Sequence, residues 1–119
     1  MIEAVAFVPV RSNDGVPYPR SFWRRLEESL IRDFSAFSRL SDVRGVWVDL
    51  PEPQERGVDP PVTYRDTSRQ YVVALLSWSQ FPVWLRAVDR ILLETGQKAL
   101  YIKVAGIPDV LRPRVVSDP

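Results

Sequence analysis

With 119 residues, the chain has the length of one domain and is large enough to bury a core without disulfides or metals. It contains no cysteine and no histidine, which excludes disulfides, thiolate nucleophiles, histidine-based triads and imidazole or thiolate metal sites. Its formal net charge of +1 gives no argument for a polyanionic partner. We therefore expect neither a metal nor a cofactor.

The chain begins with MIEAVAFVPV, a short apolar run without a basic leader or a small-residue cleavage site, so it does not resemble a signal peptide. No stretch approaches the roughly eighteen apolar residues that a membrane span requires. We expect a cytoplasmic protein.

The first half of the chain predicts a strand and then a long helix. Residues Ile2 to Val10 read as a strand, and the turn-forming stretch 11–19 follows it. From Arg20 to Arg39, apolar residues recur at steps of three and four and charged residues fill the other positions, which predicts an amphipathic helix. The stripe consists of Phe22, Leu26, Leu30, Phe34 and Phe37.

The second half predicts three strands and one more helix. A short strand is expected at 45–50, a protruding loop with four prolines at 51–61, and a long strand from Val62. Ser79 is the expected cap of a helix that ends at Thr95, with Gly96 as its left-handed C-terminal residue. The last strand is expected at 98–104, and a proline-punctuated tail follows.

The predicted order, β-α-β-β-α-β, is that of the α+β, ferredoxin-like split βαβ fold. Right-handed crossovers then place two helices on one face of a four-stranded antiparallel sheet. We expect a single ferredoxin-like domain at 1–104 and a C-terminal tail at 105–119 that packs on the sheet or on a partner.

The strand at 69–78 is apolar on both of its faces, although helices would cover only one face of the sheet. Either choice of face leaves an apolar surface, drawn from Val5, Phe7, Trp47, Tyr71, Val73, Leu75 and Tyr101. An exposed patch of this size usually marks an interface or a ligand groove. A second copy of the chain is the first candidate for the cover, the tail is the second, and a small apolar ligand is the third.

The polar stretch TYRDTSRQY, residues 63–71, offers the clearest candidate chemistry. Arg65 and Arg69 would project on one side of a strand, where two guanidinium groups can grip a carboxylate or a phosphate. The alternative, which the pattern favours, is a solvated hairpin stem with cross-strand ion pairs. Asp66, Tyr101 and Lys103 are further candidates for an acid–base or ligand-orienting role, against the simpler expectation of ordinary exposed polar residues.

Nucleic-acid binding is a weaker hypothesis. RNA-recognition domains share this topology and carry stacking aromatic residues on the first and third strands. Phe7 and Tyr71 fall near those places, but RQYVVALL lacks the glycine and the second aromatic residue of the motif. We expect core or interface aromatic residues instead.

The segments GVWVDL, YRDTSRQYVVAL and LLETGQKALYIKVAGIP resemble a group of small uncharacterised bacterial ferredoxin-like proteins. The resemblance covers about Gly45 to Gly106. It implies the architecture above and brings no activity with it. The positions that match the motifs are Trp47, Asp66, Ser68, Arg69, Tyr71, Gln97 and Tyr101.

From these observations we expect a non-enzymatic interaction or regulatory module that forms a homodimer through its open sheet face. The first alternative is a cofactor-independent small-molecule enzyme or binder of the dimeric ferredoxin-like type, with a pocket between sheet and helices near Trp47, Arg69 and Tyr101. The second alternative is a nucleic-acid-binding domain. The expected ligand or interface residues are Trp47, Asp66, Arg69, Tyr71, Val73, Tyr101 and Lys103.

Overall fold

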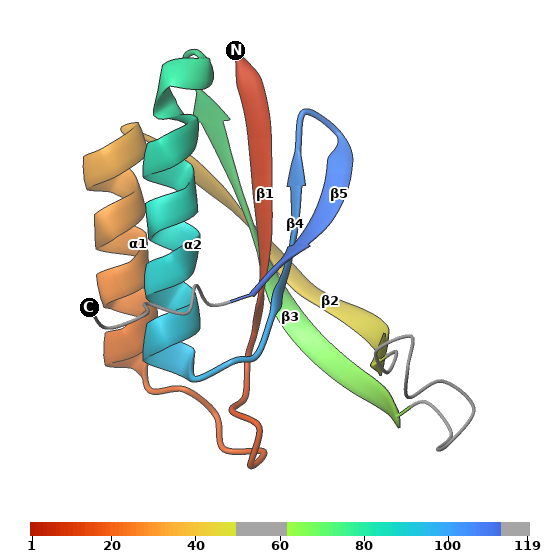
Figure 1. Ribbon diagram of the computed structural model, residues 1–119. Coiled ribbons are helices and arrows are strands. Elements are labelled where there is room, and N and C mark those ends of the chain that lie inside the picture. Colours follow the sequence, from red (N-terminus) through yellow and green to blue (C-terminus); the bar gives the residue numbers. More distant parts are fainter. Residues whose placement is uncertain (50–61, 113–119) are drawn as a thin grey trace, which may run out of the picture.

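The computed structural model describes residues 1–49 and 62–112 and shows two helices packed on one side of a twisted antiparallel sheet (Figure 1). The helices are α1 (Arg20–Phe34) and α2 (Phe81–Thr95), and a short 3-10 turn, η2 (Trp78–Gln80), precedes α2. The strands are β1 (Ile2–Pro9), β2 (Phe37–Asp49), β3 (Val62–Leu75), β4 (Leu100–Val104) and β5 (Ile107–Leu111). Within the described ranges, neither helix is long and apolar enough to cross a membrane.

The sheet has five strands among the described residues, in the order β2-β3-β1-β4-β5, and all pairs are antiparallel. The α+β class, the two helices on one face and the antiparallel pairing are confirmed. The predicted four-stranded sheet is wrong, because Ile107–Leu111 pairs with β4 and extends the sheet by one edge strand. The turn into this strand is made possible by Gly106, whose φ of 77° favours a residue without a side chain.

The predicted helix at 20–39 is too long, because α1 ends at Phe34. Ser35 adopts a left-handed conformation, with φ of 68°, and its N–H donates to the carbonyl of Ile31 at 2.8 Å. Phe37 continues the helical spacing in the sequence, but it pairs with Val73 as the first residue of β2. The strand predicted at 45–50 is consequently longer, and it carries an irregularity between Leu40 and Val43.

Helix α2 follows its prediction more closely. Pro82 lies in the first turn, and Gly96, with φ of 66°, ends the helix as expected. The predicted cap is displaced by two residues, because the side chain of Ser77, and not that of Ser79, accepts a backbone hydrogen bond at the start of η2. The predicted loop at 51–61 lies outside the described residues.

The core lies between the helices and one face of the sheet. Helix α1 packs over β2 and β3, and α2 packs over β1. Ala4, Ala6 and Val8 of β1 point into this core, as do Tyr71, Val73 and Leu75 of β3 and Leu100 and Ile102 of β4. The helices contribute most of the large side chains, namely Phe22, Trp23, Leu26, Leu30, Phe34, Trp84, Val88, Ile91 and Leu92.

Candidate functional site

The sheet face that the helices leave open carries a row of apolar and polar side chains from neighbouring strands. The register places Val72 beside Val5, and Val5 beside Lys103. One row further along, Gln70 lies beside Phe7, and Phe7 lies beside Tyr101. On the outer strand, Val110 pairs with Tyr101. Because side chains alternate along a strand, all of these residues belong to the open face.

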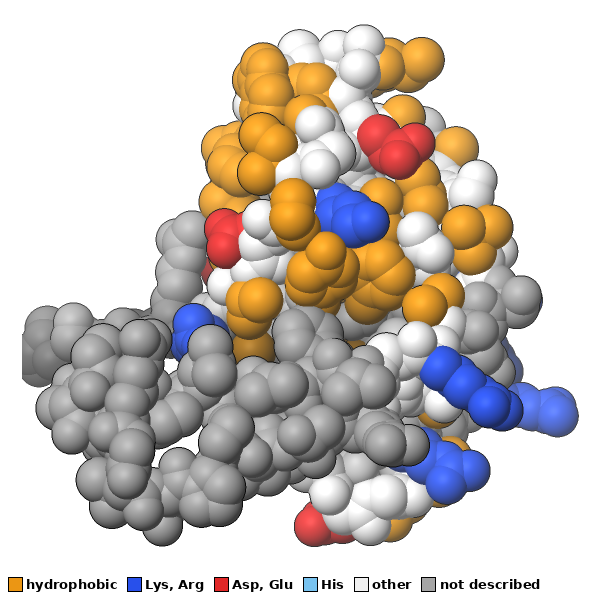
Figure 2. All heavy atoms as spheres, turned by 90° about the vertical axis from the view of Figure 1, so that its right-hand side faces the viewer, with side chains coloured by type: hydrophobic (Ala, Val, Ile, Leu, Met, Phe, Trp, Pro, Cys, Tyr) orange, Lys and Arg blue, Asp and Glu red, His pale blue; other side chains and the backbone are white. Residues whose placement is uncertain are grey.

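Phe7 and Tyr101 form the centre of this surface. Their rings lie 5.1 Å apart, between centroids, at an angle of 51°. Both rings are partly exposed, and so is Lys103. Figure 2 looks onto this side of the molecule and shows hydrophobic side chains gathered with basic and acidic side chains among them. We refer to Val5, Phe7, Val72, Tyr101 and Lys103 as the open-face cluster.

The open-face cluster has the chemistry of a ligand platform. Aromatic rings bind flat apolar rings by offset or edge contacts, and an ammonium group pairs with carboxylates. Ser68 and Asp66 extend the same face toward the outer part of β3, where Asp66 pairs with Gly45 of β2. Asp66 is partly exposed, while Ser68 is buried. The surface therefore combines aromatic, cationic and anionic groups over three strands.

On the helix-covered face, a different polar group surrounds Glu27 of α1. The carboxylate oxygen Oε2 of Glu27 accepts hydrogen bonds from the Tyr71 hydroxyl at 2.9 Å and from Arg39 at 3.0 Å. Arg69 lies 3.9 Å from the same oxygen, and its guanidinium group lies 4.0 Å from the centroid of the Trp23 ring. One carboxylate thus links α1 to both β2 and β3.

Burial, together with the hydrogen bond to Glu27, raises the pKa of Tyr71 from 10.0 to about 12. The hydroxyl therefore stays protonated and acts as a donor at every physiological pH. The Tyr71 hydroxyl donates to the carboxylate of Glu27, which Arg39 and Arg69 of the sheet also approach. This group of side chains therefore connects α1 to the sheet. It does not supply a base.

The structure separates the residues that the sequence grouped into one site. Tyr71 and Val73 were expected at the interface or ligand surface, and this is wrong: each is 1% exposed and faces the helices. The register explains the difference, since Tyr71 pairs with Ala6 and Val73 with Ala4. Parity along β3 could not be read from a strand that is apolar on both sides.

The expected pocket near Trp47, Arg69 and Tyr101 is also wrong. Arg69 pairs with Val8 and faces the helices, whereas Tyr101 pairs with Phe7 and faces the opposite side of the sheet. Trp47 pairs with Tyr64 in the outer part of the β2–β3 hairpin, and its side chain lies outside the described residues. Of the predicted group, Asp66, Tyr101 and Lys103 are the described side chains on the open face.

Two residues with a central place in these clusters were missing from the predicted group. Phe7 was expected on the apolar surface together with Val5, because the two alternate along one strand, but it was not counted among the ligand or interface residues. Glu27 was assigned to the wet side of a helix. Its position next to Leu26, at the border of the apolar stripe, indicated that it could reach the sheet. In the described ranges, no group of acidic side chains is arranged to hold a metal ion.

Comparisons with known proteins find the fold but no sequence family. No family model matches the chain, and no curated protein matches it. Among solved structures, a phage SAM lyase in complex with S-methyl-5′-thioadenosine matches with a TM-score of 0.63 and 18% identity, over 92% of this chain and 86% of that chain. A phage SAM lyase in the apo state matches with a TM-score of 0.56 and 18% identity, over 99% and 92% of the two chains.

These matches correct two expectations from the sequence. The resemblance to uncharacterised bacterial proteins is wrong as a guide, because the structures that this chain is similar to are those of a phage enzyme. The expected non-enzymatic interaction module is contradicted as well, since the structures that share the fold over nearly the whole chain are those of an enzyme. The chain has the fold of the phage SAM lyase structures.

Proposed function

We propose that this protein is an enzyme acting on a small sulfonium nucleoside of the S-adenosylmethionine type. The observation that carries the proposal is the shared fold, which spans 92% of this chain in the match to the SAM lyase with S-methyl-5′-thioadenosine. The proposal revives the alternative of a cofactor-independent small-molecule enzyme. Because one fold can host many functions, the chemistry must also be supported by a site.

We place the substrate on the open-face cluster. An adenine ring is flat and aromatic, and the ring pair of Phe7 and Tyr101, with centroids 5.1 Å apart, offers its face an aromatic surface. A sulfonium group is a cation that aromatic faces attract. Lys103, next to Val5 in the register, is suited to pair with the carboxylate of the substrate.

The reaction follows from the chemistry of the two molecules. S-methyl-5′-thioadenosine keeps the methyl and thioadenosyl groups of S-adenosylmethionine, so the bond that breaks joins the sulfonium sulfur to the γ-carbon of the aminobutyrate chain. The electron pair of that bond stays on sulfur and neutralises it. The carboxylate of the same chain forms the new bond to the γ-carbon, which closes a lactone and requires no water and no proton transfer.

A chain without histidine or cysteine suits this reaction, because no general base or protein nucleophile takes part. The carboxylate and the sulfonium lose charge as the bond forms, so the transition state is less polar than the bound substrate. Removal of water from the site strengthens that difference. Val5 is already buried in the isolated chain, at 4% exposure, and the partly exposed ring of Phe7 beside it gains such an environment when the face is covered.

We propose that a second copy of the chain provides this cover by packing on the open face. Leu40, on the same face beside Gln70, is 49% exposed, and Val72 and Val110 are partly exposed. An uncovered apolar surface of this kind on an isolated chain favours association. The site would then lie under the partner and be shielded from solvent.

The test is to incubate the purified chain with S-adenosylmethionine and to follow S-methyl-5′-thioadenosine by liquid chromatography and mass spectrometry, against a blank without protein. We expect product well above the blank. In Phe7→Leu and Lys103→Met, we expect kcat/KM to fall by about tenfold or more, which corresponds to about 1.4 kcal/mol. Calorimetric titration with S-methyl-5′-thioadenosine should show weaker binding to Phe7→Leu.

Arg86→Ala is the matched control, because Arg86 is an exposed residue of α2 on the opposite side of the sheet. It should retain full activity. If the wild-type chain forms no product and also does not bind S-methyl-5′-thioadenosine, the proposed function is contradicted. Activity that survives in both open-face variants would instead contradict the location.

A further inference from the structure

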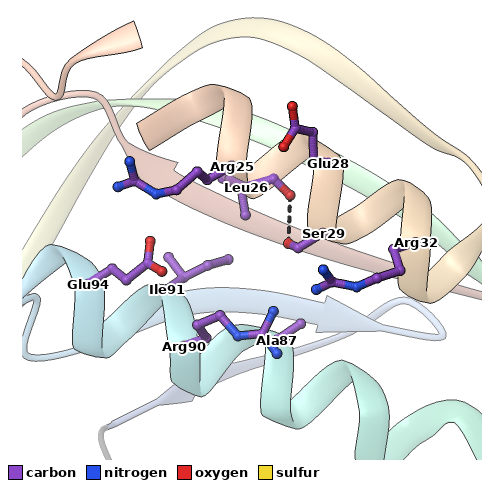
Figure 3. A pocket seen from close by; sticks show the side chains of 9 residues that line it. All are labelled: Arg25, Leu26, Glu28, Ser29, Arg32, Ala87, Arg90, Ile91 and Glu94. Atoms are coloured by element: carbon purple, nitrogen blue, oxygen red, sulfur yellow. Dashed lines mark hydrogen bonds between the residues drawn. The ribbon is translucent and has the colours of Figure 1, made fainter. Parts of the chain in front are cut away.

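A groove runs between α1 and α2 on their outer side, away from the open sheet face (Figure 3). Its volume is about 240 Å³. Leu26, Ala87 and Ile91 form an apolar floor, and charged side chains form the rim. The residues of the rim are Arg25, Glu28, Arg32, Arg90 and Glu94, with Ser29 between the floor and the rim.

Small side chains create this space between the helices. Ala87 of α2 and Ser29 of α1 line the groove at positions where a longer apolar residue would fill it. The hydroxyl of Ser29 donates to the carbonyl of Leu26 at 2.7 Å, so the side chain is held against its own helix, and its oxygen can still accept a hydrogen bond. The groove is therefore open to a ligand along its polar rim.

Two arginines from different helices converge on one end of the groove. Figure 3 shows the guanidinium groups of Arg32 and Arg90 directed toward each other across it. Within the ranges that the structure describes, Arg90 and Arg25 form no ion pair, and Arg32 forms one only with its neighbour Asp33, at 3.4 Å. Two like charges that point at one another repel, unless an anion lies between them.

The carboxylates of the rim do not neutralise this end. In Figure 3, Glu94 lies near the end where Arg25 extends, and the carboxylate of Glu28 points away from the groove. Both glutamates stand three or four residues from an arginine on their own helix, a spacing that supports only weak ion pairs in water. Asp33 pairs with Arg32 at 3.4 Å, so the unpaired positive charge at this end comes from Arg90 among the described residues.

We propose that this groove binds an oxyanion of the phosphate class between Arg32 and Arg90, with the apolar floor accepting the organic part of a phosphorylated small molecule. Guanidinium groups present paired N–H donors that match the oxygens of a phosphate. The site is separate from the open-face cluster, because the two helices and the sheet lie between them. The inference does not depend on the proposed enzymatic function.

The test is calorimetric titration of the full chain at low ionic strength with inorganic phosphate, phenyl phosphate and phenol. We expect saturable binding of phosphate and tighter binding of phenyl phosphate, because the latter also contacts the floor. Arg32→Ala and Arg90→Ala should each weaken the Kd for phenyl phosphate by about tenfold or more. Arg24→Ala, an exposed residue of α1 that does not line the groove, should change it less than twofold.

Three outcomes would overturn the inference. The first is the absence of saturable binding of either phosphate compound. The second is an equal loss of affinity in Arg24→Ala, which would indicate attraction to net charge and not a site. The third is binding of phenol as tight as that of phenyl phosphate. Far-ultraviolet circular dichroism of each variant confirms that the helices are intact.

Discussion

The two faces of the sheet use nearly the same residue types for different purposes. On β3, Tyr71 and Val73 are 1% exposed beneath the helices, whereas their immediate neighbour Val72 on the other face is only partly buried. On β1, the covered face presents Ala4 and Ala6, and the open face presents Val5 and Phe7. Composition alone does not distinguish a core from a binding surface in this protein; the register does.

The largest expected effect comes from placing an aspartate on the covered face, in comparison with the same substitution at the adjacent position on the open face. Val73→Asp places a charge among buried apolar side chains and should lower the free energy of unfolding by about 4 kcal/mol or more. Val72→Asp should lower it by about 1 kcal/mol or less, because this side chain still reaches water. Urea denaturation followed by circular dichroism measures both.

The same pair tests the proposed second copy. Sedimentation velocity of Val72→Asp should show a folded chain whose association is weaker than that of the wild type. A folded, soluble Val73→Asp chain would contradict the assignment of the covered face. An unchanged mass for Val72→Asp at all concentrations would contradict association through the open face.

A moderate effect is expected from Tyr71→Phe on the covered face. This change removes a buried hydrogen bond to a charged group and should cost about 1.5–3 kcal/mol. Glu27 keeps its ion pair with Arg39, so the helix should stay in place.

The same tyrosine gives a pH dependence with a defined sign. The pKa of Tyr71 is about 12 in the folded chain against 10.0 for the free side chain. The unfolded chain therefore loses this proton first, and the stability that the raised pKa provides is complete below pH 10 and declines between about pH 10 and 12. Two pKa units correspond to about 3 kcal/mol.

Urea midpoints measured across this range should fall more steeply for the wild type than for Tyr71→Phe. Absorbance of tyrosinate near 295 nm gives the titration directly. If the urea midpoint falls with pH equally steeply in both chains, the pKa of the Tyr71 hydroxyl is not raised in the folded chain, and the contact with Glu27 is contradicted.

The smallest effect is expected at Trp84, which sharpens the contrast with Tyr71. The Trp84 indole nitrogen is buried, and it has no hydrogen-bond partner among the residues that the structure describes. Trp84→Phe removes that unsatisfied donor and also some packing against Phe34, and these changes act in opposite directions. We expect the free energy of unfolding to change by less than about 1 kcal/mol; a loss of about 3 kcal/mol would indicate a partner for the donor.

Much of the architecture could be predicted from local patterns. The spacing of apolar residues predicts the first helix and its buried face, which contains Phe22, Leu26 and Leu30. Gly96 predicts the end of the second helix. Both signals can be read from the sequence because helical periodicity and turn preferences are local properties. The end of α1 could not be predicted. Phe37 prolongs the stripe, and only the left-handed conformation of Ser35 separates the helix from β2.

The site was harder to predict, because it depends on which residues of different strands become neighbours. Arg69 and Tyr101 stand on opposite faces, and their separation follows from pairing with Val8 and Phe7, respectively. Nothing in the local sequence fixes that register where both parities are apolar. Tyr101 and Lys103 could be assigned to one face because they alternate within a single short strand.

The alanines at the centre of β1 also bear on the position of α2. Ala4 and Ala6 are fully enclosed and nearly as small as a side chain can be, so α2, which packs over β1, can lie close to the sheet. A bulkier residue there would lift α2 from the sheet, since a close-packed interior cannot absorb the added volume. A larger side chain at either alanine would therefore displace α2 and alter the crevice that this helix forms with α1, although neither alanine lines it.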